Sequence, residues 1–411
     1  MSKPEYIFGL DVGSSNIRCI VGEILPNLPL QIVGVSVSEA AGIRKGQVFD
    51  IEEAKGAIQK TIEEISKKIG FAPESFIVSI GGSQIQSISS RGVVAVSRAD
   101  GEVSEEDVNR VIKAAEAVSL PKNKEIIHII PKEFIVDKEG GIKDPRGMHG
   151  VRLEVEAEVI LASSLYVNNL IKAVEEAGGS AESLVFSTLA ASEAVLTKRQ
   201  RELGCLVLDI GGSSTGLCVF EEGNLIYAGV LPVGASHITN DIAIAFQLPI
   251  EIAERLKLKY GFAEKKSLPS KEEIKLEEIG GEKGKTIPRK KLVEVIEARN
   301  LEILELANKE LKKIGREKLL PAGVILVGGG AKMPGLEELV KKVLHLPCQI
   351  GYPREVEGIV DKIDDPSFAT AVGLLLWEVK EGEKGGKSIK RSSISQFFSK
   401  LKRWFFEELM P

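Results

Sequence analysis

Two short stretches of the chain place an acid, glycine and hydroxyl side chains directly after an apolar run. One reads I-F-G-L-D-V-G-S-S-N-I-R from Ile7 to Arg18, and the other reads L-D-I-G-G-S-S-T from Leu208 to Thr215. Glycine lets the backbone turn sharply and approach a ligand, and successive N–H groups in such a turn form an anion site. A carboxylate at the turn, Asp11 or Asp209, holds the Mg²⁺ that accompanies a nucleotide, often through water. Both stretches therefore have the composition of a phosphate-binding turn.

The two stretches strengthen each other's interpretation. Alone, a Gly-Gly-Ser turn between two strands is equally well explained as a plain hairpin. Asp11 and Asp209 lie 198 residues apart (209 − 11), which is too far for a solenoid repeat. We therefore interpret the chain as two similar halves whose hairpins face each other and clamp the phosphates of a nucleotide from both sides.

A third glycine-rich turn, V-G-G-G-A-K-M-P-G from Val327 to Gly335, also follows an apolar strand and precedes a helix. Neither a Walker lysine pattern nor G-x-G-x-x-G is present, which disfavours the P-loop and dinucleotide-binding folds. Three glycines without an acid suit close packing against a flat base or a sugar. With the two acidic hairpins, this turn indicates a nucleotide site.

Composition bounds the class of protein. The chain has 411 residues, enough for two or more domains, and is 43% hydrophobic and 27% charged, as in ordinary globular proteins. A formal net charge of −5 argues against nucleic acid as the main partner. Four cysteines without C-x-x-C spacing indicate buried, reduced thiols of a cytoplasmic protein. The sequence predicts neither a membrane-spanning helix nor a signal peptide.

Elements that alternate between strand and helix patterns must position these turns. In the first half, strands are expected at Tyr6–Val12, Ile17–Ile24, Leu30–Val37 and Ser75–Ile80, with a covering helix from Asp50 to about Ile69. Two helices with small faces, one around Ala190 and one from Pro366 to Val379, are expected to pair.

Two segments interrupt this pattern. Residues 84–159 are predicted to form a small α+β insertion with two pairs of short strands, Ile85–Ser89 with Val93–Val96 and Glu125–Ile130 with Glu133–Val136, and a helix from Ser104 to Val118. Residues 238–314 are predicted to form a second, mainly helical insertion.

The order of these motifs resembles the actin, sugar kinase and heat-shock chaperone superfamily. Within it, the chain from Tyr6 to Trp377 is similar to the FtsA family of bacterial cell-division proteins. The most specific matches are Ile126–Asp137 (I-I-H-I-I-P-K-E-F-I-V-D), Gly147–Glu154 (G-M-H-G-V-R-L-E) and Ile296–Leu304 (I-E-A-R-N-L-E-I-L). His149 stands where a small residue is expected, in an exposed turn.

The resemblance implies an α/β, bilobed, actin-like (ribonuclease-H-like) duplicated fold, with one α+β insertion in the first half and a second insertion in the second half. We expect the following division: 1–83, 163–202 and 368–380 as the first core; 84–162 as the first insertion; 203–235 and 315–367 as the second core; 236–314 as the second insertion; 381–393 as a flexible linker; and 394–411 as an amphipathic helix.

The resemblance also implies a site for ATP and Mg²⁺. By this resemblance, Asp11 and Asp209 would organise Mg²⁺ through water. The residues carried over as nucleotide-binding are Asp11, Gly13, Ser14, Ser15, Asn16, Arg18, Asp209, Gly211, Gly212, Ser213, Ser214, Thr215, Gly234, Glu254, Lys257, Gly328, Gly329, Gly330 and Met333. From spacing alone, Glu254 and Lys257 are better explained as a solvated i,i+3 pair.

One departure from the family pattern concerns hydrolysis. Hydrolysing relatives carry an acid or glutamine just before the Ala-rich helix, where it orients the attacking water. This chain has Phe186-Ser187-Thr188 there, and serine without a local histidine is a poor general base. We therefore expect ATP binding with weak or absent hydrolysis, and no catalytic residue is assigned.

The last residues form a distinct pattern. Five of the chain's 21 aromatic residues fall in its last 15 positions. One helical face would carry Ile394, Phe397, Phe398, Leu401, Trp404 and Phe405. Basic residues around this face indicate a helix lying in the plane of an anionic membrane, each contributing ~1 kcal/mol near the surface. The alternative is a helix that docks on the protein itself or in a partner's groove.

The resemblance implies further partners. Arg299 and Glu302, at i,i+3 spacing, fit a weak surface salt bridge, whereas the family implies a surface that receives the C-terminal peptide of the tubulin-like FtsZ. The family also implies actin-like protofilaments, other division proteins as partners and a location on the cytoplasmic face of the membrane at the division site. The alternatives are a pilus-assembly ATP-binding adaptor of the same superfamily and a small-molecule kinase that shares the ATP clamp.

Overall fold

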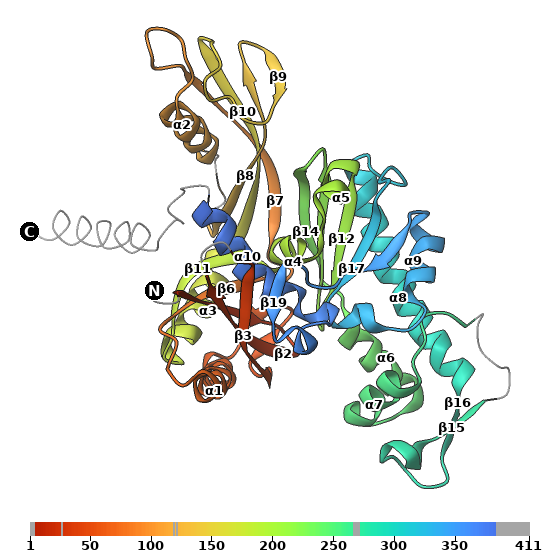
Figure 1. Ribbon diagram of the computed structural model, residues 1–411. Helices are drawn as coiled ribbons and strands as arrows, with labels where there is room; N and C mark the ends of the chain where they lie inside the picture. Colours follow the sequence, from red (N-terminus) through yellow and green to blue (C-terminus); the bar gives the residue numbers. More distant parts are fainter. Residues whose placement is uncertain (1–4, 26–27, 118–119, 121, 266–271, 384–411) are drawn as a thin grey trace, which may run out of the picture.

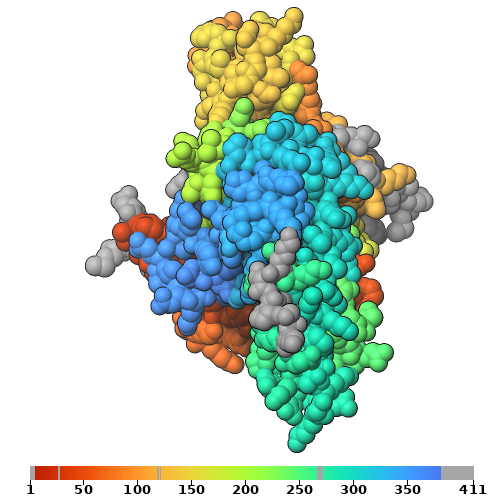
Figure 2. All heavy atoms as spheres, turned by 90° about the vertical axis from the view of Figure 1, so that its right-hand side faces the viewer, coloured from red at the N-terminus to blue at the C-terminus, as the bar shows by residue number. Residues whose placement is uncertain are grey.

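The structure is a computed structural model that describes residues 5–25, 28–117, 120, 122–265 and 272–383. Two halves, each built on one mixed β-sheet, stand side by side, and a smaller sheet rises from the junction between them (Figure 1). From the side, this smaller unit projects as a knob above the rest of the molecule (Figure 2). The fold class is mixed α/β with two insertions, as the sequence predicted.

The first sheet has the strand order β11-β6-β1-β2-β3-β19. Its strands are β1 (Glu5–Val12), β2 (Asn16–Ile24), β3 (Leu30–Glu39), β6 (Ser75–Ile80), β11 (Ser180–Phe186) and β19 (Val356–Gly358). A two-stranded hairpin of β4 (Ile43–Arg44) and β5 (Gln47–Val48) precedes α1 (Ile51–Ile69). Asp50 caps α1 by accepting the Glu53 N–H at 3.1 Å, and Gly70 ends the helix in the left-handed conformation at φ 86°.

The second sheet repeats the design of the first, with the order β14-β13-β12-β17-β18. Its strands are β12 (Cys205–Ile210), β13 (Thr215–Glu221), β14 (Asn224–Leu231), β17 (Gly323–Val327) and β18 (Cys348–Ile350). Both halves begin with an antiparallel hairpin, and a later strand pairs in parallel with the strand that carries the acid: β6 with β1, and β17 with β12. Asp11 and Asp209 therefore occupy matching places.

Two helices, α4 (Ser187–Val195) and α10 (Ala369–Glu383), pack against each other between the two sheets. A Cβ atom at Gly373 of α10 would lie 1.8 Å from the Ala190 carbonyl oxygen of α4. Backbone therefore touches backbone here, and the pairing of the two small-faced helices predicted from the sequence is confirmed.

The first insertion is a four-stranded sheet, β7-β10-β8-β9, with α2 (Glu105–Glu116) on one face. Its strands are β7 (Gln86–Ala95), β8 (Lys124–Val136), β9 (Glu139–Ile142) and β10 (Arg152–Ser163). The prediction of two pairs of short strands was wrong, because β7 and β8 are each continuous. A shift in register beside Pro131 lets β8 continue, and Gly92 keeps β7 close to α2, where a Cβ would meet the Val111 carbonyl oxygen at 2.1 Å.

Gln84 holds the two ends of this insertion together. Its side chain donates to the Gly81 carbonyl at 2.8 Å and accepts the Ser163 N–H at 2.9 Å. Its backbone carbonyl accepts the Lys124 ammonium at 2.7 Å. The entry and exit of the insertion are therefore joined at one buried amide.

The second insertion packs three helices around its own apolar core. It contains α6 (Ala235–Phe246), α7 (Ile250–Tyr260), β15 (Glu273–Lys275), β16 (Thr286–Pro288) and α8 (Arg289–Lys313). The remaining helices are α3 (Ser164–Glu176), α5 (Lys198–Leu203), α9 (Leu336–Leu344) and the 3₁₀ helices η2 (Leu276–Ile279), η3 (Gly329–Lys332), η4 (Val360–Lys362) and η5 (Pro366–Phe368).

Two segments differ from the sequence-based division. Strand β19 pairs in parallel with β3, so it adds to the first sheet although residues 315–367 were expected in the second core. Helix α10 extends to Glu383, past the expected start of the linker at residue 381. The expected membrane helix, 394–411, lies outside the described residues. Within the described part, no helix has the length and apolarity that crossing a membrane requires.

Candidate functional site

The three glycine-bearing turns predicted from the sequence meet around one cavity of about 430 Å³. Residues from both halves and from the second insertion line it. The predicted residues that line it are Asp11, Gly13, Ser14, Ser15, Asn16, Arg18, Asp209, Gly211, Gly212, Ser214, Glu254, Lys257, Gly328, Gly329, Gly330 and Met333. The fold therefore brings residues that are up to several hundred positions apart in sequence together around this cavity.

Asp11 is held at the floor of the cavity by two neighbours. Its carboxylate accepts the Ser79 hydroxyl at 2.8 Å, and the same Ser79 oxygen accepts the Val12 N–H at 2.9 Å. Arg18, directly opposite in the β1–β2 register, lies 3.7 Å from the carboxylate. Burial raises the pKa of Asp11, and Arg18 and Ser79 oppose this rise.

Asp209 occupies the matching place at the end of β12. Burial and the nearby negative charge of Asp11 raise the pKa of Asp209 to about 7, while Arg18 acts in the opposite direction. Gly328 approaches it so closely that a Cβ there would lie 2.5 Å from the Asp209 Oδ1. Two acids therefore face the same space, and the charge of Asp11 opposes the ionisation of Asp209.

The two hairpins touch each other across the cavity. The Ser213 hydroxyl donates to the Ser14 hydroxyl at 2.6 Å, and Ser14 also accepts the Gly46 N–H at 3.0 Å. A Cβ at Gly212 would lie 2.2 Å from the Ser15 hydroxyl oxygen. The two hairpins therefore face each other at close range, as a two-sided clamp requires.

Three predicted residues do not line the cavity. Thr215 is fully buried, and its hydroxyl donates to the Val233 carbonyl at 2.8 Å. The Ser213 hydroxyl is used in the contact with Ser14. Gly234 packs behind the hairpin, where a Cβ would lie 2.6 Å from the Gly211 carbonyl oxygen. These residues shape the second hairpin, and none offers a side chain to a ligand.

Glu254 and Lys257 line the cavity from α7. They do form an i,i+3 ion pair, at 2.7 Å, but Lys257 is buried, which a solvated pair would not be. The ammonium also donates to the Thr239 hydroxyl at 2.8 Å and to the Ala235 carbonyl at 3.3 Å. The pair therefore joins α7 to the beginning of α6.

Three buried polar atoms of lining residues have no hydrogen-bond partner within the described part of the chain. They are Arg18 Nε, Thr188 Oγ1 and Asn300 Nδ2. A buried polar group without a partner is costly, and a polar ligand that met these three atoms would remove that cost.

Sequence reasoning missed Ser79, Thr188 and Asn300. Asn300 left a signal, because it interrupts the apolar stripe of α8 midway between Ile296 and Leu304. Ser79 and Thr188 have weaker signals: Ser79 lies near the end of the strand expected at Ser75–Ile80, and Thr188 follows Ser187, where relatives that hydrolyse ATP carry an acid or glutamine. Ser187 itself is the first residue of α4 and lines the cavity.

Comparisons with known proteins identify the family of this chain. A family model described as "Cell division protein FtsA" matches residues 206–373, and one described as "SHS2 domain inserted in FTSA" matches residues 82–161. A cell division protein FtsA from Borreliella burgdorferi is 39% identical over 407 residues, which cover 98% of each chain. The chain belongs to the FtsA family. It is thus an actin-like cell division protein.

Solved structures resemble this FtsA-family chain in fold. A chain of the PilM–PilN type IV pilus biogenesis complex has a TM-score of 0.63 at 20% identity, covering 90% of this chain and 98% of its own. MreB5 of Spiroplasma citri bound to ADP has a TM-score of 0.56 at 12% identity, covering 93% and 99%. At these identities the likeness establishes the actin-like fold alone.

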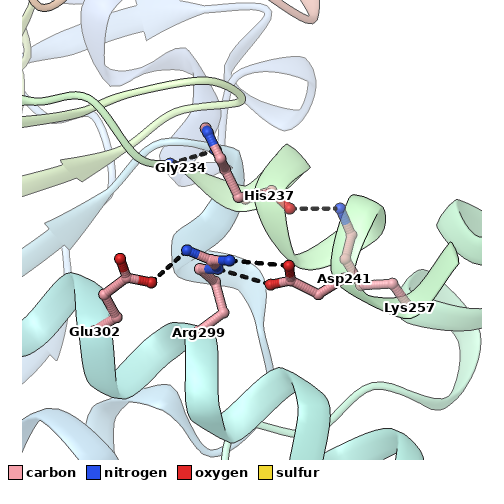
Figure 3. Close-up of polar contacts among 7 residues, drawn as sticks. Gly234, His237, Asp241, Lys257, Arg299 and Glu302 are labelled. Atoms are coloured by element: carbon pink, nitrogen blue, oxygen red, sulfur yellow. Dashed lines mark hydrogen bonds and ion pairs between the residues drawn. The ribbon is translucent and has the colours of Figure 1, made fainter. Parts of the chain in front are cut away.

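Arg299 and Glu302, the two residues for which the sequence suggested a partner-binding role, both lie on α8 (Arg289–Lys313). Arg299 forms a bidentate ion pair with Asp241 of α6, at 2.7 and 2.9 Å, and also contacts Glu302 (Figure 3). The sequence had suggested only the pair with Glu302. The hydrogen bonds that Arg299 donates to Asp241 raise the pKa of Arg299. Arg299 therefore ties α6 to α8 in addition to placing charge on the surface.

Helix α6 begins beside the second glycine-bearing hairpin and carries Asp241, the partner of Arg299, near its middle. Its first N–H groups, of Ala235 and Ser236, donate to the Gly211 and Gly212 carbonyls at 2.9 and 2.7 Å. His237 accepts the Gly234 N–H at 3.1 Å (Figure 3). This FtsA-family chain thus places one helix against both of its expected binding regions.

Proposed function

We propose that the protein binds ATP with Mg²⁺, assembles into actin-like protofilaments and tethers FtsZ filaments to the cytoplasmic membrane at the division site. The membrane contact would be made by residues 394–411. Family membership supports the role in cell division. The observation that carries the nucleotide proposal is the cavity between the two acidic hairpins, with its three unpartnered polar atoms.

ATP fits the chemistry of this cavity. Backbone N–H groups and hydroxyls of both hairpins would bind the phosphates, and Arg18 would add a cation. Gly328, Gly329, Gly330 and Met333 would lie against the adenosine, with Glu254, Lys257 and the Asn300 amide as polar contacts. The solved neighbour that was crystallised with ADP supports the same ligand class, although its identity is low.

Mg²⁺ fits the two facing acids. Asp11 and Asp209 would hold it together with phosphate oxygens and water, which is how Mg²⁺ usually binds in nucleotide sites. When bound, the ion would neutralise phosphate charge. No cluster of three or more His, Cys, Asp or Glu side chains that could hold a metal occurs among the described residues, so the nucleotide would have to supply the remaining ligands.

We propose weak or absent hydrolysis. Ser187 stands at the start of α4, where the relatives that hydrolyse carry an acid or glutamine. The Ser187 hydroxyl oxygen would lie only 2.9 Å from a Cβ at Gly81, so it is confined between α4 and the end of β6. The protein would hold nucleotide as a structural ligand and would hydrolyse it slowly or not at all.

The two alternative functions have less support. The pilus-complex chain shares the fold at 20% identity, whereas the FtsA relative shares 39% over nearly the whole chain. A small-molecule kinase would need an acid that activates its substrate, and the sequence offers no obvious one after the first hairpin. The adaptor role in cell division is therefore preferred.

Removal of residues 394–411 tests the tether directly. In co-sedimentation with vesicles containing anionic lipid, ATP and FtsZ, we expect the full chain to pellet with the vesicles and to carry FtsZ with it. The truncated chain should lose at least 90% of this binding, because burial of the apolar face and about 1 kcal/mol per basic residue are both removed. Undiminished pelleting of the truncated chain on the same vesicles would refute the membrane role of these residues.

Charge reversal at Arg299 tests the partner surface. We expect Arg299→Glu to weaken binding of the FtsZ C-terminal peptide at least tenfold, or about 1.4 kcal/mol, measured by fluorescence anisotropy. Arg289→Glu is a matched control, since Arg289 begins the same helix and forms a similar bidentate pair with Glu272 at 2.9 Å. Equal peptide affinity of the Arg299 variant and the unchanged protein would place the peptide elsewhere.

A further inference from the structure

Arg18 is the positive charge that stands against both acids of the cavity. Its guanidinium lies 3.7 Å from the Asp11 carboxylate, and its charge also favours ionisation of Asp209. The antiparallel register of β1 and β2 places Arg18 directly opposite Asp11. One cation is thus shared between two carboxylates.

Packing fixes the Arg18 side chain in this place. The guanidinium carbon lies 5.3 Å from the centre of the Phe368 ring, a cation–π distance, and the side chain is only 15% exposed. Its Nε–H is buried and has no hydrogen-bond partner among the residues that the structure describes. Arg18 therefore keeps a donor for a ligand while its charge serves the two acids.

The other two cations that line the cavity are occupied elsewhere. Lys257 pairs with Glu254 at 2.7 Å, and Lys332 pairs with Asp365. Neither neutralises the Asp11–Asp209 pair. Removal of the charge at position 18 would consequently leave the two carboxylates facing each other without a compensating cation.

The charges of Asp11, Asp209 and Arg18 determine which ligands the cavity favours. With Arg18 present, the two ionised carboxylates and the guanidinium sum to −1 (−2 + 1), and a bare divalent cation would meet the guanidinium as well as the acids. A nucleotide brings its own negative oxygens, which neutralise the guanidinium and accept its free N–H. Metal and nucleotide together therefore match the site better than metal alone.

We propose that Arg18 is the residue that makes divalent-metal binding by Asp11 and Asp209 conditional on nucleotide. In the empty cavity Arg18 is the counter-ion of the acids and keeps bare metal out. In the loaded cavity it binds phosphate. This inference deepens the proposed nucleotide binding and rests on it for the second step only.

Metal binding without nucleotide tests the first step. Mn²⁺ alone, followed by electron paramagnetic resonance or calorimetry, should bind the full chain weakly. Arg18→Met should bind one Mn²⁺ at least tenfold more tightly, because the competing charge is gone. Arg18→Lys should remain as weak as the unchanged protein, because the charge is kept. Equal Mn²⁺ affinity in Arg18→Met and the unchanged protein would overturn the proposal.

Binding of Mg·ATP to the same variants tests the second step. Arg18→Met should lose at least tenfold in affinity, so that the two ligands change in opposite directions, which misfolding does not produce. Arg201→Met is a matched control: Arg201 lies 4.7 Å from the Phe220 ring centre, pairs with Glu193 at 3.0 Å and is 16% exposed, but does not line the cavity. It should change neither affinity.

The two proposals fail in distinguishable ways. If the unchanged protein shows no affinity for Mg·ATP but Arg18→Met gains Mn²⁺, nucleotide binding is wrong and the metal-excluding role of Arg18 stands. If Mg·ATP binds and Arg18→Met gains no Mn²⁺, the role of Arg18 is wrong and nucleotide binding stands.

Discussion

Replacement of Gly373 by alanine is expected to destabilise the protein by about 3 kcal/mol. Helix propensity alone predicts the opposite sign, since alanine stabilises a helix interior by roughly 1 kcal/mol relative to glycine. The new Cβ, however, would lie 1.8 Å from the Ala190 carbonyl oxygen and 2.3 Å from its carbonyl carbon. Both atoms are backbone, so no side chain can rotate away, and α10 must separate from α4. Urea or thermal unfolding of the full chain measures the loss.

Gly56 provides the matched control for this substitution. It lies within α1, is exposed, and a Cβ there would meet nothing within 4 Å. Gly56→Ala should therefore raise stability by about 0.5–1 kcal/mol. Because α4 begins at Ser187 in the cavity wall, Gly373→Ala should also weaken binding of Mg·ATP. If both glycine variants shift the unfolding midpoint in the same direction, the close approach of α4 and α10 is not the reason that position 373 requires glycine.

Asp209→Asn is expected to stabilise the empty protein at high pH and to damage the loaded one. The pKa of Asp209 is about 7 in the folded protein, against ~3.9 in an unfolded chain. Between these values the folded state holds a proton that the unfolded state has lost. Stability attributable to Asp209 is therefore present at low pH and is lost as pH rises through about 7.

The size and the reversal of this effect are both measurable. In EDTA without nucleotide, the stability gained by Asp209→Asn should be about 3 kcal/mol larger at pH 8 than at pH 5, because each of the two pH units between 5 and 7 contributes about 1.4 kcal/mol. With saturating Mg·ATP at pH 8, the order should reverse, because the unchanged protein gains binding energy that the variant loses. Asp361→Asn, the same substitution at an exposed site outside the cavity, is the matched control. A stability difference that stays constant from pH 5 to pH 8 would contradict the assignment.

Much of the fold could be predicted because its signals are local and repeated. The acid–glycine–serine turn occurs twice, and the helix of residues 51–69 carries both an N-cap and a left-handed glycine at its end. The small residues on the helices around Ala190 and Gly373 predicted that these two helices pack against each other. These features depend on residues close in sequence, where backbone preference and hydrophobic spacing act directly.

The errors arose where tertiary contacts override local signals. The expected break between Ile130 and Glu133 contains Pro131, but a bulge carries β8 through it. The expected break between Ser89 and Val93 contains Gly92, which instead allows the close approach of α2. Strand β19 has only three residues, Val356–Gly358, and nothing in so short a segment tells which of two sheets it will join. Its partner β3 lies more than 300 positions away in sequence.

The site shows the same division. The acids, the glycines and Arg18 could be predicted because binding of phosphate and Mg²⁺ requires residues of these types. Asn300 and Asp241 were missed because their roles depend on which helix face meets which neighbour. Asn300 can be recognised as a cavity residue only when α8 is known to lie against the cavity. Asp241 can be recognised as a partner of Arg299 only when α6 is known to lie beside α8. The buried state of Lys257 likewise follows from packing between α6 and α7, which i,i+3 spacing does not reveal.

The amide of Gln84 has a consequence for the order of folding. Strands β6 and β11 pair in parallel, yet the whole first insertion separates them along the chain. Joining them through an unfolded loop of that length would carry a large closure entropy and a high contact order. Once the insertion has folded and Gln84 has bridged Gly81 to Ser163, only α3 and its short connections remain between the two strands. The inserted subdomain thus acts as an intramolecular template that brings the ends of its host sheet together.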